Sequence, residues 1–216
     1  TSLGSLSMGA GVVTGDYNVA IGNEAGYDLT SGTRNTFVGY RSGYEATTDT
    51  SNTGVGYNSL KSSKTSTNNV AIGDSALEAN VDGDANVAVG YLALRVFEPA
   101  NGATYNTAVG YSAGVAMTTG THNTIMGGLA GDALTTGINN TLVGTQAGSG
   151  TTTGGTNTFI GVSAGAANEG GGDNIAIGKG ANFGGASFSN AIVIGTDILQ
   201  NLGSNTTEIG TTATTK

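Results

Sequence analysis

Apolar and polar positions follow one short phrase that returns along the whole chain. The phrase starts with Asn, passes through three mostly apolar or Thr positions and ends in Gly, as at 18–22 and 35–39. We number each repeat from this Asn as position 1. Position 4 is β-branched in nine of ten copies, which is typical of a strand on a half-buried surface. Because side chains alternate between the two faces of a strand, positions 2 and 4 share one face and position 3 points to the other. Each copy therefore predicts a short strand.

The glycine at position 5 recurs at a nearly constant interval. Successive copies lie 17 residues apart, with one interval of 20. A fixed short period indicates stacked identical units. Seventeen residues suit one coil of an all-β parallel β-solenoid, or β-roll, whose coils stack at about 4.8 Å. The structural glycines are Gly22, Gly39, Gly56, Gly73, Gly90, Gly110, Gly127, Gly144, Gly161, Gly178 and Gly195.

Three other positions carry further expectations. We expect the Val and Ile residues of position 4 to fill the interior and position 3 to face outward. Outward residues such as Phe37 and Phe159 then need cover, which predicts a parallel homotrimer with position 3 at the interface. Position 8 is always Ala or Ser, so we expect no room for a larger side chain there. The Asn column is interpreted either as an amide ladder between coils or as a set of local turn caps.

The organisation predicted is a single repeat domain over 1–216, with about 11–12 coils. Degenerate copies are expected at 5–17, where Ser7-Met8-Gly9 reads as the first, and at 190–216, where the phrase carries one extra residue at 190–195. The longer interval places a loop insertion near 95–103, with the only proline of the chain. Because binding residues concentrate on loops of rigid scaffolds, Phe97, Glu98 and Pro99 are a candidate contact loop. A tolerated insertion without a role is the alternative.

Composition excludes several classes of protein. The net charge is −8 with only 7 Lys and Arg residues, which disfavours nucleic-acid binding. No cysteine is present, so disulfides and thiol chemistry are excluded. No apolar run approaches the 18 residues of a membrane-spanning helix. With 39 Gly, 1 Pro and 37% hydrophobic residues, the chain is neither collagen-like nor typical of disorder.

Candidate chemistry is sparse. His122 is the only histidine and is interpreted as a turn residue. Acidic residues gather at 74–84, where one Ca²⁺ ion or simply a solvated turn is possible. Paired threonines at 118–119, 135–136 and 152–153 recur as an ice-binding array would, but the column is interrupted in other coils. We therefore expect no enzyme and assign no catalytic, cofactor-binding or metal residues.

The phrase Asn106-Thr107-Ala108-Val109-Gly110, with Ala113-Gly114 after it, resembles the shaft repeats of phage tail fibres. Asn18-Val19-Ala20-Ile21-Gly22 is similar to the head repeats of bacterial trimeric autotransporter adhesins, although the coil here is longer. The resemblance spans about 5–210. It implies β-rolls packed as threefold homotrimers that serve in attachment on an extracellular surface appendage or virion.

The partners expected from this resemblance are copies of the chain itself and a cell-surface glycan or protein receptor. The alternative is a self-assembling extracellular filament protein, because solenoid ends without caps leave strand edges that invite end-to-end joining.

Overall fold

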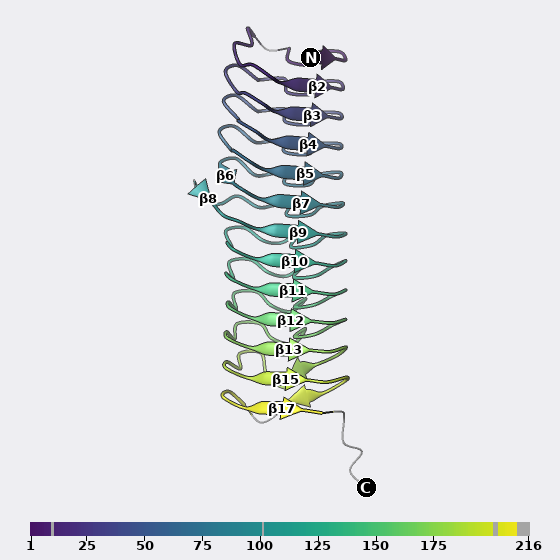
Figure 1. Ribbon diagram of the computed structural model, residues 1–216, viewed down its shortest axis with the longest axis vertical. Coiled ribbons are helices and arrows are strands. Elements are labelled where there is room, and N and C mark those ends of the chain that lie inside the picture. Colours follow the sequence, from purple (N-terminus) through teal and green to yellow (C-terminus); the bar gives the residue numbers. More distant parts are fainter. Residues whose placement is uncertain (10, 101, 201–202, 211–216) are drawn as a thin grey trace. The chain divides into compact units, whose positions relative to one another are not determined.

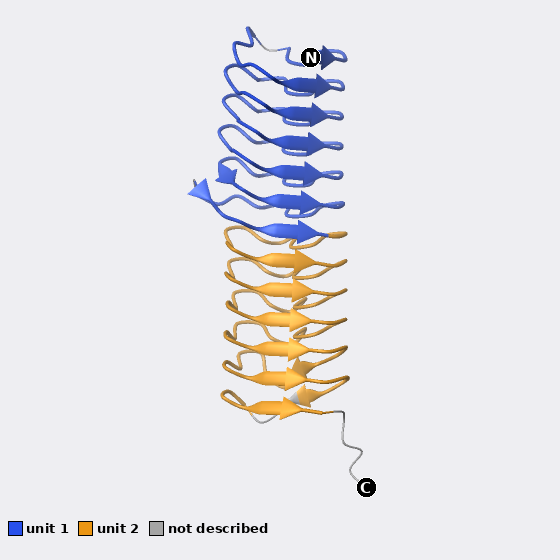
Figure 2. Cartoon of the chain, in the orientation of Figure 1, with its two compact units in different colours: residues 1–109 blue, residues 110–216 orange. Residues whose placement is uncertain are grey.

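The computed structural model describes residues 1–9, 11–100, 102–200 and 203–210. It is an all-β structure with no helix among these residues. Two compact units are present, residues 1–109 and residues 110–216 (Figure 2). The expectation of a single domain over 1–216 stays a prediction.

Each unit is a stack of short parallel strands (Figure 1). The order is β1-β2-β3-β4-β5-β7-β9 in the first unit and β10-β11-β12-β13-β15-β17 in the second, and β6 with β8 and β14 with β16 form separate pairs. Most neighbours pair 17 residues apart, as Thr141 does with Thr158. The parallel β-solenoid is confirmed. The strands are β1 (Ser2–Leu3), β2 (Val19–Ile21), β3 (Thr36–Val38), β4 (Thr53–Val55), β5 (Val70–Ile72), β6 (Gly83–Asp84), β7 (Val87–Val89), β8 (Gly102–Ala103), β9 (Thr107–Val109), β10 (Thr124–Met126), β11 (Thr141–Val143), β12 (Thr158–Ile160), β13 (Ile175–Ile177), β14 (Asn182–Phe183), β15 (Ile192–Ile194), β16 (Leu199–Gln200) and β17 (Thr207–Ile209).

The N-terminal copy begins earlier than the sequence suggested. Leu3 pairs with Ile21, and Gly4 has a φ of 135° like the glycines of position 5. Gly4, and not Gly9, is therefore the equivalent of Gly22, so the expected first copy at 5–17 lacks its own strand. The mistake arose because Thr1-Ser2-Leu3-Gly4 has no Asn at its start.

The C-terminal copies are partly as expected. Ile209 pairs with Ile194, which confirms the last degenerate copy, while residues 211–216 of that copy lie outside the described residues. The expectation that the phrase at 190–195 carries an extra residue is wrong. The backbone N–H of Ala191 donates to Oδ1 of Asn174 (3.0 Å), so Ala191 occupies position 1. Asn190 takes the left-handed turn conformation (φ 55°) that Asp173 has one coil earlier.

The orientation of the strands is opposite to the prediction. Position 3 points into the interior: Phe37, Ala88 and Phe159 are 0% exposed. Position 4 faces outward, and Ile72 and Ile160 are 40% exposed. Position 3 therefore cannot form a contact between copies. The pattern misled because both faces of the strand are apolar, so alternation alone did not mark the inner one.

Position 9 compensates for the variable size of position 3. A Cβ atom at Gly43 would lie 2.5 Å from Cδ1 of Phe37, so a large residue at position 3 occupies the space over position 9. Where position 3 is Gly54, Ala71 or Ala88, position 9 is a buried leucine, such as Leu77. The compensation is incomplete, because the coils of Ala20 and Ala108 have Gly26 and Gly114 at position 9. The Ala and Ser residues of position 8 are all 0% exposed, which confirms that this place has no room for larger side chains.

The Asn column forms a ladder between coils. The backbone N–H of Asn35 donates to Oδ1 of Asn18 (2.9 Å), and Nδ2 of Asn35 donates to the same oxygen (3.1 Å). Nδ2 also donates to the carbonyl of Asp49, 14 residues further along the chain (2.6 Å). Equivalent bonds recur at Asn140 and Asn157. The ladder interpretation is confirmed, and each rung satisfies buried backbone groups of two adjacent coils.

The glycines of position 5 lie so close to the next coil that no side chain fits. Their φ angles lie between 124° and 145°, a region that only glycine adopts readily. A Cβ atom at Gly127 would overlap the carbonyl oxygen of Gly144. Gly128, the next residue, has nothing within 4 Å of its Cβ position. The two neighbours therefore differ in whether they can accept a methyl group.

Replacing Gly127 by Ala should destabilise the protein by about 2–3 kcal/mol, because backbone strain and a clash between coils add together. Gly128→Ala is the matched control and should change the free energy of unfolding by less than about 0.5 kcal/mol. Urea denaturation followed by circular dichroism measures both. Equal midpoints for the two variants would contradict the close approach at position 5.

Candidate functional surface

The outward strand residues make one uncharged face on each unit, which we call the flat face. It consists of positions 2 and 4. Most of these side chains are half-exposed, and Met126 is 43% exposed. Nearby outward positions do carry charge, as at Arg41 and Lys179. In the first unit the flat face comprises Val19, Thr36, Thr53, Val70, Val87 and Thr107 with Ile21, Val38, Val55, Ile72, Val89 and Val109. In the second it comprises Thr124, Thr141, Thr158, Ile175, Ile192 and Thr207 with Met126, Val143, Ile160, Ile177, Ile194 and Ile209.

The threonine hydroxyls differ between the strands and the turns. At position 13 they hold adjacent coils together: Oγ1 of Thr30 donates to the carbonyl of Thr47 (3.0 Å), and Oγ1 of Thr135 donates to that of Thr152 (2.9 Å). Within the described part of the chain, the hydroxyls of Thr36, Thr53, Thr124, Thr141 and Thr158 form no such bond. Of the paired turn threonines, those of position 13 are thus engaged with the next coil, whereas Thr119, Thr136 and Thr153 at position 14 are exposed.

An aromatic cluster covers one corner of the first unit. The rings of Tyr40 and Tyr57 stack at 5.3 Å, and those of Tyr27 and Tyr44 stack at 5.2 Å. The guanidinium of Arg41 lies 5.1 Å from the ring centroids of both Tyr40 and Tyr44, a favourable cation–π geometry. Tyr40 and Tyr57 occupy position 6, whereas Tyr27 and Tyr44 belong to the variable arm, so the repeat pattern alone does not predict this cluster.

A buried carboxyl group lies in the first unit. Asp49 is 0% exposed. Its Oδ2 accepts a hydrogen bond from Oγ of Ser63 (2.5 Å), while its Oδ1 has no partner among the described atoms. Burial raises the pKa of Asp49 to about 7, and the negative charges of Asp82 and Asp84 contribute in the same direction. Hydrogen bonds from Ser63 and Ser66 oppose this shift.

The stability of the protein should therefore depend on the protonation of Asp49. A carboxyl group whose pKa is higher in the folded state binds its proton more tightly when folded, so stability falls as the pH rises from about 4 to about 7. This loss should be on the order of 3 kcal/mol. Asp49→Asn should abolish it and be more stable than the wild type at pH 8. Urea midpoints measured between pH 4 and pH 8 test this, and parallel pH profiles for the two proteins would contradict it.

The candidate contact loop is mostly internal. Phe97 is 0% exposed and Pro99 is buried, whereas Glu98 is exposed. Both buried side chains pack over Gly83, whose Cβ position lies 2.6 Å from Cγ of Pro99 and 3.2 Å from Cε1 of Phe97. The coil accommodates these two side chains because the missing side chain at Gly83 makes room. Asn101 lies outside the described residues. A contact role for this loop stays a prediction, with Glu98 as its exposed member.

The acidic residues at 74–84 are engaged in separate interactions. Oδ1 of Asp82 accepts a hydrogen bond from Oγ1 of Thr65. Oδ1 of Asp84 accepts one from the backbone N–H of Thr67 (2.6 Å). Glu78 lies 4.0 Å from Nζ of Lys61. In the part of the chain that the structure describes, no three His, Asp or Glu side chains lie close enough together to hold a metal ion.

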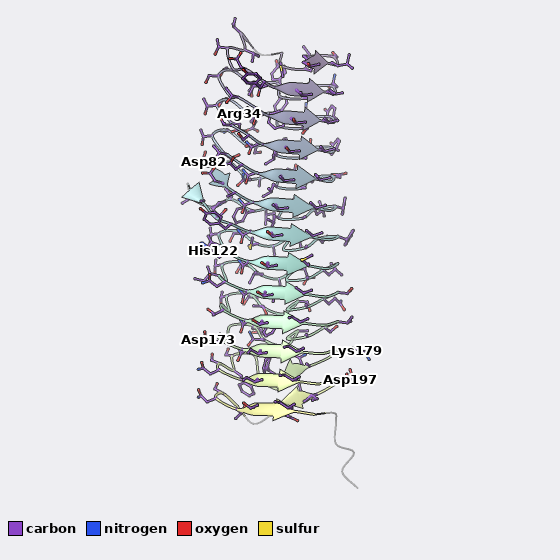
Figure 3. The ribbon with its side chains drawn as sticks, viewed as in Figure 1. Arg34, Asp82, His122, Asp173, Lys179 and Asp197 are labelled. Carbon is purple, nitrogen blue, oxygen red and sulfur yellow. The ribbon has the colours of Figure 1, made fainter. Side chains whose placement is uncertain are left out.

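Titratable residues of the second unit lie on different edges of the coils. In the second unit, His122 and Asp173 lie on one edge of the coils and Lys179 with Asp197 on the opposite edge (Figure 3). His122 has a φ of 60° at the turn position 17, as expected of a turn residue. No pocket is found on the described surface. The flat face is therefore the most extended regular feature that the fold presents to solvent.

Comparisons with family models, curated proteins and solved structures found no match for this chain. Over residues 1–9, 11–100, 102–200 and 203–210, the structure contains no helix able to cross a membrane.

Proposed function

We propose that this chain is a structural segment of a surface fibre or adhesin, of the kind found in phage tail fibres, and that it serves in attachment. The observation that carries the proposal is the continuous bonding between coils. In each unit, successive strands pair in parallel register. The Asn ladder adds buried hydrogen bonds between coils, just before each strand begins. Repeats that contact mainly their neighbours can be extended without changing each coil. Such a stack suits holding other parts of an appendage at a distance.

The proposal includes association with copies of the chain, as a parallel homotrimer, on an extracellular appendage or virion. The apolar residues of position 3 no longer motivate the trimer, because they lie in the interior. Contacts between copies must therefore come from outward residues of the coils or of the arms. A cell-surface glycan or protein is the receptor class that fits attachment, and Glu98 is an exposed candidate on the loop.

The second candidate is a self-assembling filament. Strands β1 and β17 each have only one neighbour among the described strands. Unpaired strand edges are templates for pairing with another chain. Joining of such edges between copies would lengthen the stack end to end.

Light scattering coupled to size-exclusion chromatography separates the two candidates. A discrete trimer of the full chain that binds cells or a glycan array supports the fibre proposal. Polymers that grow with concentration support the filament. A monomer at high concentration that binds neither cells nor glycans contradicts both.

A further inference from the structure

The flat face of the second unit combines regularity with exposed hydroxyl groups. Thr124, Thr141 and Thr158 are opposite one another in consecutive strands. Two residues further along the same strands, Met126, Val143 and Ile160 are likewise aligned. Parallel strands repeat at about 4.8 Å across the stack, and side chains two residues apart along a strand lie about 6.6 Å apart. The outward side chains therefore form a two-column grid.

This grid is held rigidly from behind. The neighbouring Asn side chains join each coil to the next through hydrogen bonds of about the same length. The backbone N–H of Asn140 donates to Oδ1 of Asn123 (2.9 Å), and that of Asn157 donates to Oδ1 of Asn140 (3.0 Å). The glycines of position 5 fix the opposite end of each strand by close backbone approach. Within the unit, strands β10 to β13 keep nearly one direction (Figure 1). Untwisted sheets of this kind are unusual and typically rely on side-chain ladders.

The chemistry of the grid favours ordered water over a dry protein surface. The hydroxyls of Thr124, Thr141 and Thr158 form no hydrogen bonds with the described residues, and burial without a partner would cost free energy at each of them. A second copy of the same face supplies donors and acceptors only at its own threonine hydroxyls, since its other side chains are Val, Ile and Met. A lattice of water molecules supplies both, while the methyl groups of Thr, Val and Ile order the adjacent water layer.

We propose that the flat face binds ice. Its two repeats lie close to the oxygen repeats on a prism face of hexagonal ice. Water held by the threonine hydroxyls and around the methyl groups then joins the crystal surface and anchors the protein to it. Positions 2 and 4 carry no charged side chain in the second unit, so the water layer directly over the grid has no strongly hydrated group within it. This activity goes beyond attachment to a cell and does not depend on the fibre proposal.

The test is partition of the full chain between liquid and a slowly grown ice hemisphere, together with thermal hysteresis. The face variant is Thr141→Lys with Thr158→Lys. The matched control is Thr136→Lys with Thr153→Lys, which adds the same charge at exposed turn positions of two consecutive coils, 123–139 and 140–156. Melting curves establish that each variant is folded. Thr141→Tyr with Thr158→Tyr replaces the face variant if the lysines unfold it, since Tyr is favoured in strands.

We expect the wild type and the turn control to enter the ice and to depress its growth temperature, and the folded face variant to lose both properties. Exclusion of the wild type from ice would overturn the proposal, as would equal loss in both lysine variants. If the wild type is excluded and the face variant dissociates an oligomer, the flat face is an interface between copies. In that outcome ice binding fails while the fibre proposal stands.

Discussion

Ala88→Asp should unfold the coil around strand β7, whereas Val89→Asp should be tolerated. Ala88 is 0% exposed at position 3, so a carboxylate there would be buried without a partner. An uncompensated buried charge costs about 3–5 kcal/mol or more, and the larger side chain would also crowd the neighbouring coils. Val89 is half-exposed at position 4. An aspartate there keeps its contact with water and should cost about 1 kcal/mol through poorer strand propensity.

Urea denaturation of the two variants measures this difference directly, since they introduce the same charge at adjacent residues of one strand. The variant with the lower urea midpoint carries its aspartate on the inward face of the strand. A lower midpoint for Val89→Asp than for Ala88→Asp would restore position 4 to the interior and contradict the orientation of every coil.

Backbone requirements were predictable from the sequence. The glycines of position 5 recur because a Cβ atom would overlap the next coil, as at Gly127. The Asn column recurs because each amide satisfies buried groups of two coils, as at Asn35. Both requirements come from one coil lying directly on another, so the period alone predicts the solenoid.

Side-chain direction was not predictable in the same way. Position 4 is uniform and β-branched, which resembles a core column, while position 3 ranges from Gly54 to Phe37. Such variation in side-chain size is typical of an exposed position. It is instead compensation across the interior, because Cδ1 of Phe37 lies 3.2 Å from the Cβ position of Gly54, and Gly43 makes room for the same ring. Only the pairing of positions 3 and 9, which spans seven residues such as Phe37 to Gly43, would have shown which face is buried.

The flat face was likewise not predictable from the sequence, for a physical reason. Threonines at positions 2 and 13 are alike in sequence, and both columns recur with the coil. Their hydroxyls differ because the turn brings Oγ1 of Thr135 to the carbonyl of Thr152, whereas Thr141 lies on a strand and points away from the chain. The burial of Phe97 was not evident from the sequence, because the room for its ring comes from Gly83, which belongs to the preceding coil.

Exchange of size between positions 3 and 9 should be tolerated where either change alone is not. Phe37→Ala removes a buried ring and should cost about 3–5 kcal/mol. Gly43→Leu places a side chain where Cδ1, Cε1 and Cζ of Phe37 lie 2.5–2.6 Å from the new Cβ. Such overpacking should cost about 1–3 kcal/mol. The double variant recreates the arrangement of Ala71 and Leu77, whose leucine has a φ of 50°, close to the 59° of Gly43.

A double-mutant cycle from urea denaturation of the three variants and the wild type gives the coupling between the two positions. We expect the double variant to be more stable than either single variant, with a coupling free energy of about 2–3 kcal/mol in its favour. The gain arises because the leucine fills the volume that the ring leaves, at a position whose left-handed backbone other coils already accept with leucine. If the stability loss of the double variant equals the sum of the losses of the two single variants, the two positions are not coupled. The compensation between positions 3 and 9 would then be contradicted.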